Sequence, residues 1–427
     1  MSSKLPLRGV GFALVAYQKS AWLVALPVLF LLLLVTGVVY SSSTAERSQQ
    51  MKPSDRKAAE NQVPLASASV RKGASDHYMM LVNTAIAFRL QDQDLAQFNK
   101  SPYDGISVAF SYNYDTAPPP SVGELDAKIA HWSTITKKDI WPWVFVNRMI
   151  GVDDTEENHY TKDNVYFHRI KGADLEDKAG ALSDFLLNWQ NALQAAKDSH
   201  VPGIVCDLEF YNYHKEYSIE ELSKQTGKKP RELVELLRQV GVKMADLAGA
   251  RYPDATLWFL FTGFGYKGHW TINGEPYNSV PTYIVTGMLD EIQQKHFPLK
   301  VISGGEASLA YCHDSLDKFR EKIAARESAF LPELQKYRGI FELGGTMTLF
   351  SDRSTMQGWV KQDCSSSQAS VVEDLEPYLE LLLKTFRYNW IYASSDGGYN
   401  AFQAQTAPRF DAVIRKAQQK VLGSSPH

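Results

Sequence analysis

From residue 76 to the end, the chain alternates short apolar runs with longer amphipathic stretches. The short runs are rich in β-branched and aromatic residues, as buried strands are, and the longer stretches repeat their apolar residues at helical spacing. In the stretch 181–197, Leu182, Phe185, Trp189 and Leu193 fall on one side of a helix. We predict strands at Tyr78–Phe88, Gly105–Phe110, Ile140–Val146, Gly203–Cys206, Thr256–Thr262, Leu299–Ser303, Gly339–Leu343 and Trp390–Ala393, with helices near 92–98, 122–135, 179–197, 230–249, 281–295, 371–386 and 409–421 and from about 315.

Eight strand–helix units over this length predict an α/β fold, a (β/α)8 TIM barrel, with parallel strands inside and helices outside. An open doubly wound sheet is the alternative, and it usually carries a glycine-rich phosphate loop after its first strand. No such loop follows Tyr78–Phe88. Gly263, Gly265 and Gly268 match the dinucleotide spacing, but the residues after them do not open a helix, so we interpret them as a barrel loop.

The amino terminus contains an apolar segment long enough to span a bilayer. No charged residue occurs from Ser20 to Ala45, and Lys4, Arg8 and Lys19 precede the segment. About twenty apolar residues cross a membrane as a helix, and the positive-inside rule places the first residues in the cytoplasm. A cleavable signal peptide is the competing interpretation, and both predict export of the main domain.

These patterns divide the chain into four parts. Residues 1–19 are a cytoplasmic amino terminus, 20–41 a transmembrane signal-anchor, 42–75 a flexible linker rich in small and polar residues, and 76–427 the barrel domain. We therefore expect a protein anchored in the membrane through its N-terminal helix, with the main domain extracytoplasmic, in the periplasm or at the cell surface.

Composition narrows the class of partner. The formal net charge is -3 and no long basic run occurs, which argues against nucleic acid. Three cysteines do not make a disulfide framework, and Cys206 lies in an apolar run typical of a buried thiol. The histidines are scattered without metal-ligand spacing, so we expect neither a metal nor a cofactor.

Acidic residues follow several predicted strands, at the end where TIM barrels place their active sites. Asp207 and Glu209 close the fourth strand two positions apart, so both point to one face of an extended chain. Close carboxylates raise one another's pKa, which keeps one protonated as a general acid. Glu306, Glu342 and Asp396 are the acids at the ends of the sixth, seventh and eighth strands.

Polar and aromatic residues at the same strand ends are candidates for sugar binding. An amide and a guanidinium can hydrogen-bond sugar hydroxyls, and an aromatic face can stack on a pyranose ring. Capping, salt bridging and core packing are the alternatives for the same residues. The candidates are Asn147, Arg148, Tyr211, Trp390, Tyr392 and Asp396.

At these residues the chain resembles the glycoside hydrolases with TIM barrels. The Gly-x-x-x-Asp-x-Glu-aromatic end of the fourth strand looks like the close of the chitinase-type signature, although Val205 stands where that signature has a further Asp. A larger retaining clan places its acid/base on strand four and its nucleophile on strand seven. Glu209 and Glu342 are similar in placement, but Leu208 replaces the Asn usual before the first.

The resemblance implies a glycoside hydrolase-like enzyme acting on an envelope or extracellular polysaccharide. Glu209 would protonate the leaving oxygen, and Glu342 or Glu306 would act as nucleophile or base, with Asp207 tuning Glu209. A non-catalytic glycan-binding or scaffolding barrel is the alternative. A carbohydrate deacetylase or lyase is a third possibility, and the missing metal motif counts against the deacetylase.

Overall fold

The computed structural model describes most of the region predicted to be the barrel. Contacts divide the chain into two units, residues 1–67 and 68–427, and every described residue belongs to the second unit. The described residues are 77–82, 90–110, 119–145, 150–153, 169–173, 175–176, 180–208, 219–264, 270–272, 275–309, 315–349, 371–392, 402 and 404–423.

Parallel strands form one sheet of nine, in the order β11-β10-β7-β6-β3-β2-β1-β13-β12. All neighbouring pairs in this sheet are parallel, as the strand–helix alternation predicts. The strands are β1 (Tyr78–Val82), β2 (Gly105–Ala109), β3 (Asp139–Phe145), β6 (Gly203–Asp207), β7 (Thr256–Phe259), β10 (Lys300–Ser303), β11 (Phe341–Leu343), β12 (Gly345–Thr348) and β13 (Tyr388–Tyr392).

The two edge strands of this order are consecutive in the chain, which closes the sheet into a barrel. Only Gly344 separates β11, which pairs with β10, from β12, which pairs with β13. The Gly344 N–H donates to Ser303 O at 2.7 Å. A Cβ at this position would lie 3.0 Å from Ile302 Cγ2 on β10 and 3.0 Å from Tyr388 O on β13, so residue 344 lies between these two strands and bridges them. The structure is therefore an eight-position α/β barrel.

The first and last predicted strands are hydrogen-bonded neighbours, as a closed barrel requires. β1 and β13 pair over their full length, from Tyr78 with Tyr388 to Val82 with Tyr392. This pairing confirms the predicted (β/α)8 TIM barrel and rules out the open doubly wound sheet. The described part of β1 ends at Val82, so the predicted extension to Phe88 lies outside the described residues.

The strand registers determine which residues lie at one level of the barrel. A count from each paired residue to its partner on the next strand, once around the barrel, starts at Tyr78 and returns to the first strand at position 86. The shift of about eight residues is the shear of a TIM barrel. Each step to the next strand therefore shifts the level by about one residue. Starting at Tyr78, the positions passed are Tyr388, Gly344, Gly304, Leu260, Asp207, Phe145 and 111.

Aromatic rings fill the lower half of the barrel interior. Tyr78 packs edge-on against Trp141 and Trp258, with ring centroids 5.6 and 6.1 Å apart, and Trp258 packs edge-on against Tyr388 at 5.5 Å. The Trp141 indole donates to the Tyr78 hydroxyl, which donates to Asp139. A Cβ at residue 105 would lie 2.4 Å from the Tyr78 hydroxyl, so glycine is needed where this ring packs.

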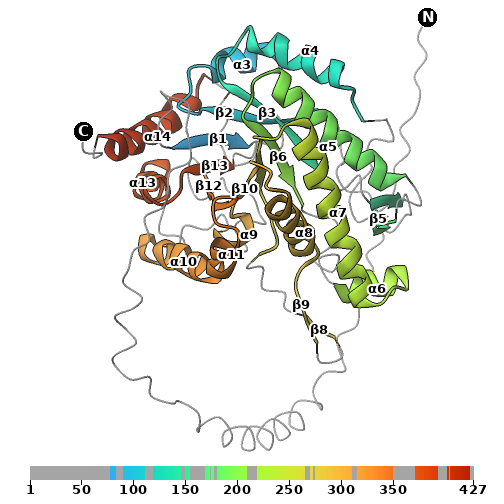
Figure 1. The fold of residues 1–427 in the computed structure, drawn as a ribbon. Coiled ribbons are helices and arrows are strands. Elements are labelled where there is room, and N and C mark those ends of the chain that lie inside the picture. The colour runs from blue at the N-terminus through green and yellow to red at the C-terminus, as the bar shows by residue number, and fades with distance from the viewer. Residues whose placement is uncertain are drawn as a thin grey trace, which may run out of the picture. The chain divides into compact units, whose positions relative to one another are not determined.

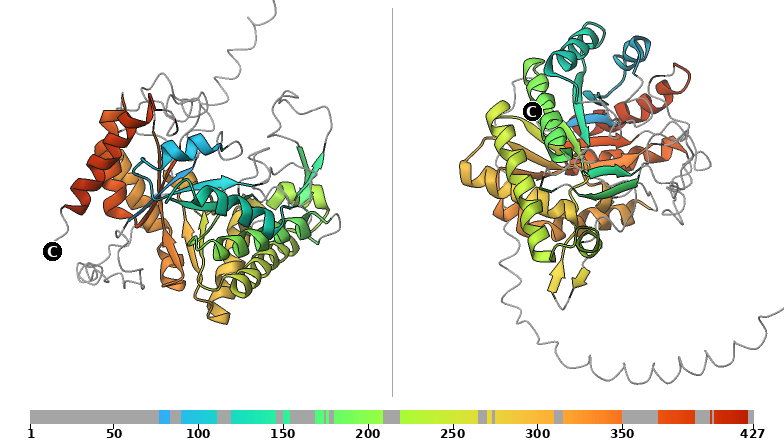
Figure 2. Two further views of the ribbon diagram at one scale, coloured as in Figure 1. Left: turned by 90° about the horizontal axis from the view of Figure 1, so that it is seen from above. Right: turned by 90° about the vertical axis from the view of Figure 1, so that its right-hand side faces the viewer.

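Helices cover the outside of the barrel (Figure 1). Each predicted helix is confirmed, with bounds shifted by a few residues. In Figures 1 and 2, α13 and α14 lie on the opposite side of the barrel from α5 and α7. The helices are α3 (Asp92–Phe98), α4 (Val122–Ser133), α5 (Ala181–Asp198), α6 (Ile219–Thr226), α7 (Pro230–Arg251), α8 (Val280–Lys295), α9 (Glu306–Leu309), α10 (Leu316–Ala329), α11 (Leu331–Lys336), α13 (Glu376–Thr385) and α14 (Ala407–Leu422), with the 3₁₀ turn η4 (Val372–Leu375) before α13.

Insertions after three successive barrel strands meet beside the barrel. The hairpin β4 (Ile150–Asp153) and β5 (Arg169–Ala173) follows β3, α6 follows β6, and the hairpin β8 (Trp270–Ile272) and β9 (Glu275–Tyr277) follows β7. Helix α6 contacts both β5 and β8 (Figures 1 and 2). Since β8 is a strand, the glycines from Gly263 onward do not lead into a helix, as the sequence predicts.

Helices α7 and α8 approach each other closely through two glycines. A Cβ on Gly241 would lie 1.9 Å from Ile284 O, and one on Gly287 would lie 2.2 Å from Arg238 O. Real side chains do not fit at these distances, so glycine sets the spacing of the two helices.

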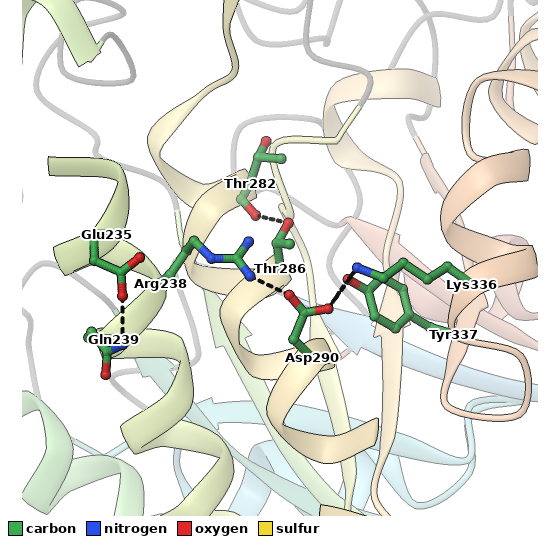
Figure 3. Close-up of polar contacts among 8 residues, drawn as sticks. All are labelled: Glu235, Arg238, Gln239, Thr282, Thr286, Asp290, Lys336 and Tyr337. Atoms are coloured by element: carbon green, nitrogen blue, oxygen red, sulfur yellow. Dashed lines mark hydrogen bonds and ion pairs between the residues drawn. The ribbon is translucent and has the colours of Figure 1, made fainter. Parts of the chain in front are cut away.

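A polar cluster links the same two helices to the residues that end α11 (Figure 3). Asp290 on α8 accepts from Arg238 on α7, and also from Lys336 Nζ and the Tyr337 hydroxyl, both at 2.7 Å. Burial alone would raise the pKa of Asp290, but these three donors outweigh burial and lower it. The half-buried carboxylate therefore stays charged and holds three helical segments together.

Helix α14 packs across the start of the barrel through main-chain and ionic contacts. Gln418 donates to Pro102 O at 3.2 Å, and Lys416 lies 2.5 Å from Glu376 on α13. Asp411 on the same helix has a buried oxygen, Oδ1, that finds no hydrogen-bond partner among the described residues. Burial raises the pKa of Asp411 from 3.8 to about 6, although Arg415 and Lys138 oppose the shift.

No helix in the described part of the chain is long and apolar enough to cross a membrane. The predicted signal-anchor at 20–41 lies outside those residues and stays a prediction, as do the predicted limits of the cytoplasmic terminus and the linker.

We expect Gly287→Ala to destabilise the fold by roughly 1–3 kcal/mol, because the added methyl group would force α7 and α8 apart. Gly123→Ala on α4 is the matched control, since a Cβ there meets nothing within 4 Å. It should be neutral or stabilise by up to about 1 kcal/mol. Denaturant unfolding of both variants tests this, and equal effects would show that the close crossing is not a constraint.

We expect Asp411→Asn to stabilise the protein at neutral pH but not in acid. A raised pKa means that the folded state prefers the protonated acid, so the charge costs stability above about pH 6 and costs little below pH 4. After allowance for solvent screening, the gain should be about 1 kcal/mol at pH 7–8. Thermal unfolding across pH 4–8 measures it, and a pH-independent gain would contradict burial of a charge.

Candidate active site

Asp207 ends strand β6 and turns its side chain toward the barrel interior. It pairs in register with Phe145 on β3, and it is fully buried. The Leu260 N–H donates to the carbonyl of the preceding Cys206 at 3.0 Å, which continues the sheet beyond β7. Asp207 is thus a carboxyl group at the carboxyl end of a barrel strand, where the sequence predicts an active site.

Glu306 is held at the end of β10 by a glycine pair. Gly305 has φ +92°, a conformation that other residues adopt with strain, and it immediately precedes the short helix α9. The Glu306 N–H donates to Leu260 O at 3.3 Å, and the Gly304 N–H donates to Phe259 O at 2.6 Å. Hydrogen bonds therefore run from Glu306 through Leu260 to the end of β6.

The registers bring Asp207 and Glu306 to one level of the barrel. The pairings lead from Asp207 to the opposite strand, β13, by two routes. One direction around the barrel ends at Tyr388 and the other at position 396. The midpoint, Tyr392, therefore lies across the barrel from Asp207 at equal height. The same count places Glu306 across from Ala109. Asp207, Glu306 and Tyr392, all predicted site residues, therefore share one level near the carboxyl ends of the strands, at the barrel mouth.

Trp390 lies two residue steps below this level and is fully buried. Its indole N–H donates to Gly304 O at 3.0 Å, and its ring packs edge-on against Tyr392 at 6.5 Å. The side chain thus holds the glycine pair from inside the barrel. Of the two roles that the sequence leaves open, the geometry matches a packed barrel tryptophan that supports the mouth.

A buried arginine holds the same loop from outside. Arg326 on α10 donates to Ser303 O at 2.6 Å and also to Gly344 O, and its guanidinium lies over the Phe330 and Phe386 rings. Burial lowers its pKa to about 9, which leaves it charged at neutral pH. Sequence reasoning missed Arg326, but its place on the apolar stripe of Phe319, Ile323 and Phe330 was an available signal.

Glu342 lies at the other end of the barrel. It is the second residue of β11, and its carboxylate lies 3.7 Å from Lys300 Nζ, at the start of β10. Its charge also contributes to the raised pKa of Tyr388, which is raised mainly by burial and begins β13. The registers put Glu342 level with Asp139 and about five residues below Asp207. This place does not suit the catalytic role predicted for Glu342.

The remaining predicted site residues, Glu209, Asn147, Arg148, Tyr211 and Asp396, lie outside the described residues. Cys206 is confirmed as a buried free thiol, and burial raises its pKa well above 9 with a further contribution from Asp207. Within the described ranges no three His, Cys, Asp or Glu side chains gather as metal ligands.

Comparison with known proteins assigns no family. No family model matches the chain, and no curated protein matches it. Solved structures that match include endo-glycoceramidase II from a Rhodococcus species, at 10% identity and a TM-score of 0.45 over 79% of this chain and 78% of that one. The GH18 chitinase ChiB of Flavobacterium johnsoniae matches at 11% identity and 0.37, over 82% and 96%.

A 3-keto-D-glucoside 4-epimerase from E. coli matches at 10% identity and a TM-score of 0.39, over 80% of this chain and 99% of that one. These similarities are too low to carry an argument about fold or activity. The barrel assignment therefore rests on the strand order and registers, and the site on the carboxylates at the mouth.

Proposed function

We propose that the protein is a glycoside hydrolase-like enzyme that cleaves a glycosidic bond in an envelope or extracellular polysaccharide. The observation that carries this proposal is the shared level of Asp207 and Glu306 at the carboxyl ends of two barrel strands. Two carboxyl groups across a cleft are the minimal machinery of glycosidic cleavage. Glu209 follows Asp207 by two positions in the sequence, and in this proposal it is a further acid of the site.

In this mechanism Glu209 is the general acid, and it protonates the oxygen of the leaving sugar. Glu306 acts from two strand positions away, as nucleophile or as base toward water. Adjacent strands are about 4.8 Å apart, so the Cα atoms at the two strand ends are separated by about 10 Å. Inward-leaning side chains can then reach the separations of about 5–9.5 Å that retaining and inverting enzymes use.

Asp207 acts in this proposal on Glu209 rather than on the substrate. A buried carboxylate two residues away disfavours ionisation of a neighbouring acid and so favours its protonated form. Residue 205, two positions before Asp207, supports a mechanism with two protein carboxylates. Val205 stands where the chitinase-type signature has a further acid, and the absence of that acid disfavours substrate-assisted catalysis.

A non-catalytic glycan-binding or scaffolding barrel is the second candidate. The departures at Val205 and Leu208 favour it, because both positions normally help the strand-four acid in the families that the chain resembles. Turnover of a glycan decides between the two candidates, since both would bind sugar.

We also propose that residues 20–41 anchor the protein in a membrane and that the barrel lies outside the cytoplasm. The charge asymmetry around the apolar segment supports this.

We expect Glu209→Gln and Glu306→Gln each to lower turnover of a cleaved polysaccharide by roughly 10²–10⁴-fold while binding persists, because each removes a transferable proton or a nucleophile but keeps the shape. Glu342→Gln is the matched control and should keep most of the activity. Release of reducing ends from a panel of polysaccharides measures the effect. Binding without turnover in the unmodified protein would favour the glycan-binding barrel, and full activity in both variants would remove these acids from the mechanism.

A reporter fused after residue 75 should be active only when the reporter functions outside the cytoplasm. Alkaline phosphatase, which needs export to fold, and a fluorescent protein that folds in the cytoplasm make a matched pair. Cytoplasmic fluorescence without phosphatase activity would contradict the proposed topology.

A further inference from the structure

Positive charge collects at the base of the barrel, the end at which the strands begin. We define the base as the described loops that lead from a helix into the next barrel strand, with one residue on each side of each loop. Its charged residues are the cations Lys100, Lys137, Lys138, Arg251, Lys295, Lys300, Lys336, Arg338 and Arg387 and the acids Asp104, Asp139, Asp198 and Asp254. Cations are thus in clear excess at the base, although the formal net charge of the whole chain is -3.

These loops lie side by side, because main-chain hydrogen bonds join neighbouring loops around the barrel. On one side the Tyr78 N–H donates to Arg387 O at 2.7 Å, and on the other the Lys300 N–H donates to Ala255 O at 3.1 Å. The base is therefore one continuous face. Its cations are spread around that face and are not gathered at a single point.

The cations of the base are turned to solvent more than its acids are. Four cations are exposed and form no ion pair among the described residues, namely Lys100, Lys137, Arg251 and Arg338. Two of the acids are half-buried and bind groups of the barrel itself. Asp104 accepts from the Met79 N–H at 2.8 Å, and Asp139 accepts from the Tyr78 hydroxyl at 2.9 Å. The positive charge is thus the part of the base that an external partner meets.

Cations at the carboxyl ends of helices often do no more than complement the helix dipole. This explanation covers Arg251, Lys295 and Lys336, the last residues of α7, α8 and α11, and the two lysines also pair with carboxylates. It does not account as well for Lys137 and Arg338, which lie in loops beyond the helix ends. Their charge is left for a partner outside the barrel.

The preceding part of the chain joins the barrel at this same face. His77 comes directly before β1, and its ring nitrogen Nδ1 lies 3.4 Å from Phe386 O in the loop before β13. The predicted linker, residues 42–75, is therefore attached at the base and not at the mouth. A flexible chain of that length spans about 30–35 Å on average, so a membrane anchor ahead of it would hold the base close to the bilayer.

We propose that the base of the barrel docks on a bilayer surface rich in anionic phospholipids, with its exposed lysines and arginines against the lipid phosphates. Each cation held near such a surface strengthens binding by roughly fivefold. A bilayer is an extended plane, so it fits cations that ring a whole face better than a small anion does. The docked barrel points its mouth away from the bilayer, because the strands run from base to mouth. Docking does not require that the barrel cleave glycans.

Cutting the linker separates docking from anchoring. A specific protease site would be placed in the linker of the full-length protein, near residue 67, where contacts divide the chain. The released barrel would then be sedimented with vesicles of phosphatidylglycerol and phosphatidylcholine, or of phosphatidylcholine alone. We expect it to bind the anionic vesicles at low salt and to leave them at high salt, because salt screens the attraction, and not to bind the neutral vesicles.

Two double variants test whether the base carries the binding. Lys137→Gln with Arg338→Gln should weaken binding to the anionic vesicles by roughly 25-fold, the effect of two lost cations. Lys229→Gln with Lys318→Gln is the matched control, since it removes the same charge from the ends of α7 and α10 that are remote from the base. All four side chains are exposed, so both variants should keep the fold, and thermal unfolding checks this.

Equal weakening in the two double variants would overturn the proposal, because net charge alone would then explain the binding. Equal binding to neutral vesicles, or no binding to anionic vesicles at low salt, would overturn it as well. Binding to soluble polyglutamate without binding to vesicles would assign the face to an acidic polymer and not to a lipid surface. Retention of the uncut protein on neutral vesicles reports on the anchor alone, and release of reducing ends reports on the hydrolase alone.

Discussion

The barrel depends on a single stretch of main chain, residues 341–348, that pairs with a different neighbour in each half. Its first half, β11, pairs with β10, and its second half, β12, pairs with β13. Gly344 lies where the two halves meet. Closure with a stagger of about eight residues then determines which side chains share a level. The aromatic base, the buried tryptophan beneath the mouth and the acidic level above it all follow from this one constraint.

The Gly344 carbonyl lies at this seam and accepts from Arg326, which also binds the end of β10. A buried cation without a described carboxylate partner is costly, and main-chain carbonyls offset only part of that cost. Its position is informative because the loop that it holds carries Glu306. A costly buried charge therefore holds the segment that the proposed chemistry needs to be rigid, which is how preorganised sites are usually supported.

The sequence predicted most of the fold, because the alternation of strands and helices is a repeating signal. Each of the eight strands and the helix after it was found within a few residues. The β4–β5 and β8–β9 hairpins and the short helices α6 and α9 were missed, since they are local insertions without a long periodic pattern. For the candidate site, the rule that chemistry lies at strand ends pointed to Asp207 and Glu306, which the registers place at one level. The same rule misplaced Glu342, because only the register shows that this strand continues past Gly344 and leaves Glu342 near its beginning.

The contact of α6 with both hairpins has a consequence for how this protein can change over evolution. Of the insertions after three consecutive barrel strands, α6 contacts both hairpins, so none of the three is a separate appendage. A change of length in one of them would disturb the packing of the other two, so they are free to vary only in concert. Recombination that transplants a new rim onto this scaffold should succeed when both hairpins and α6 are exchanged together, and fail when one hairpin is exchanged alone.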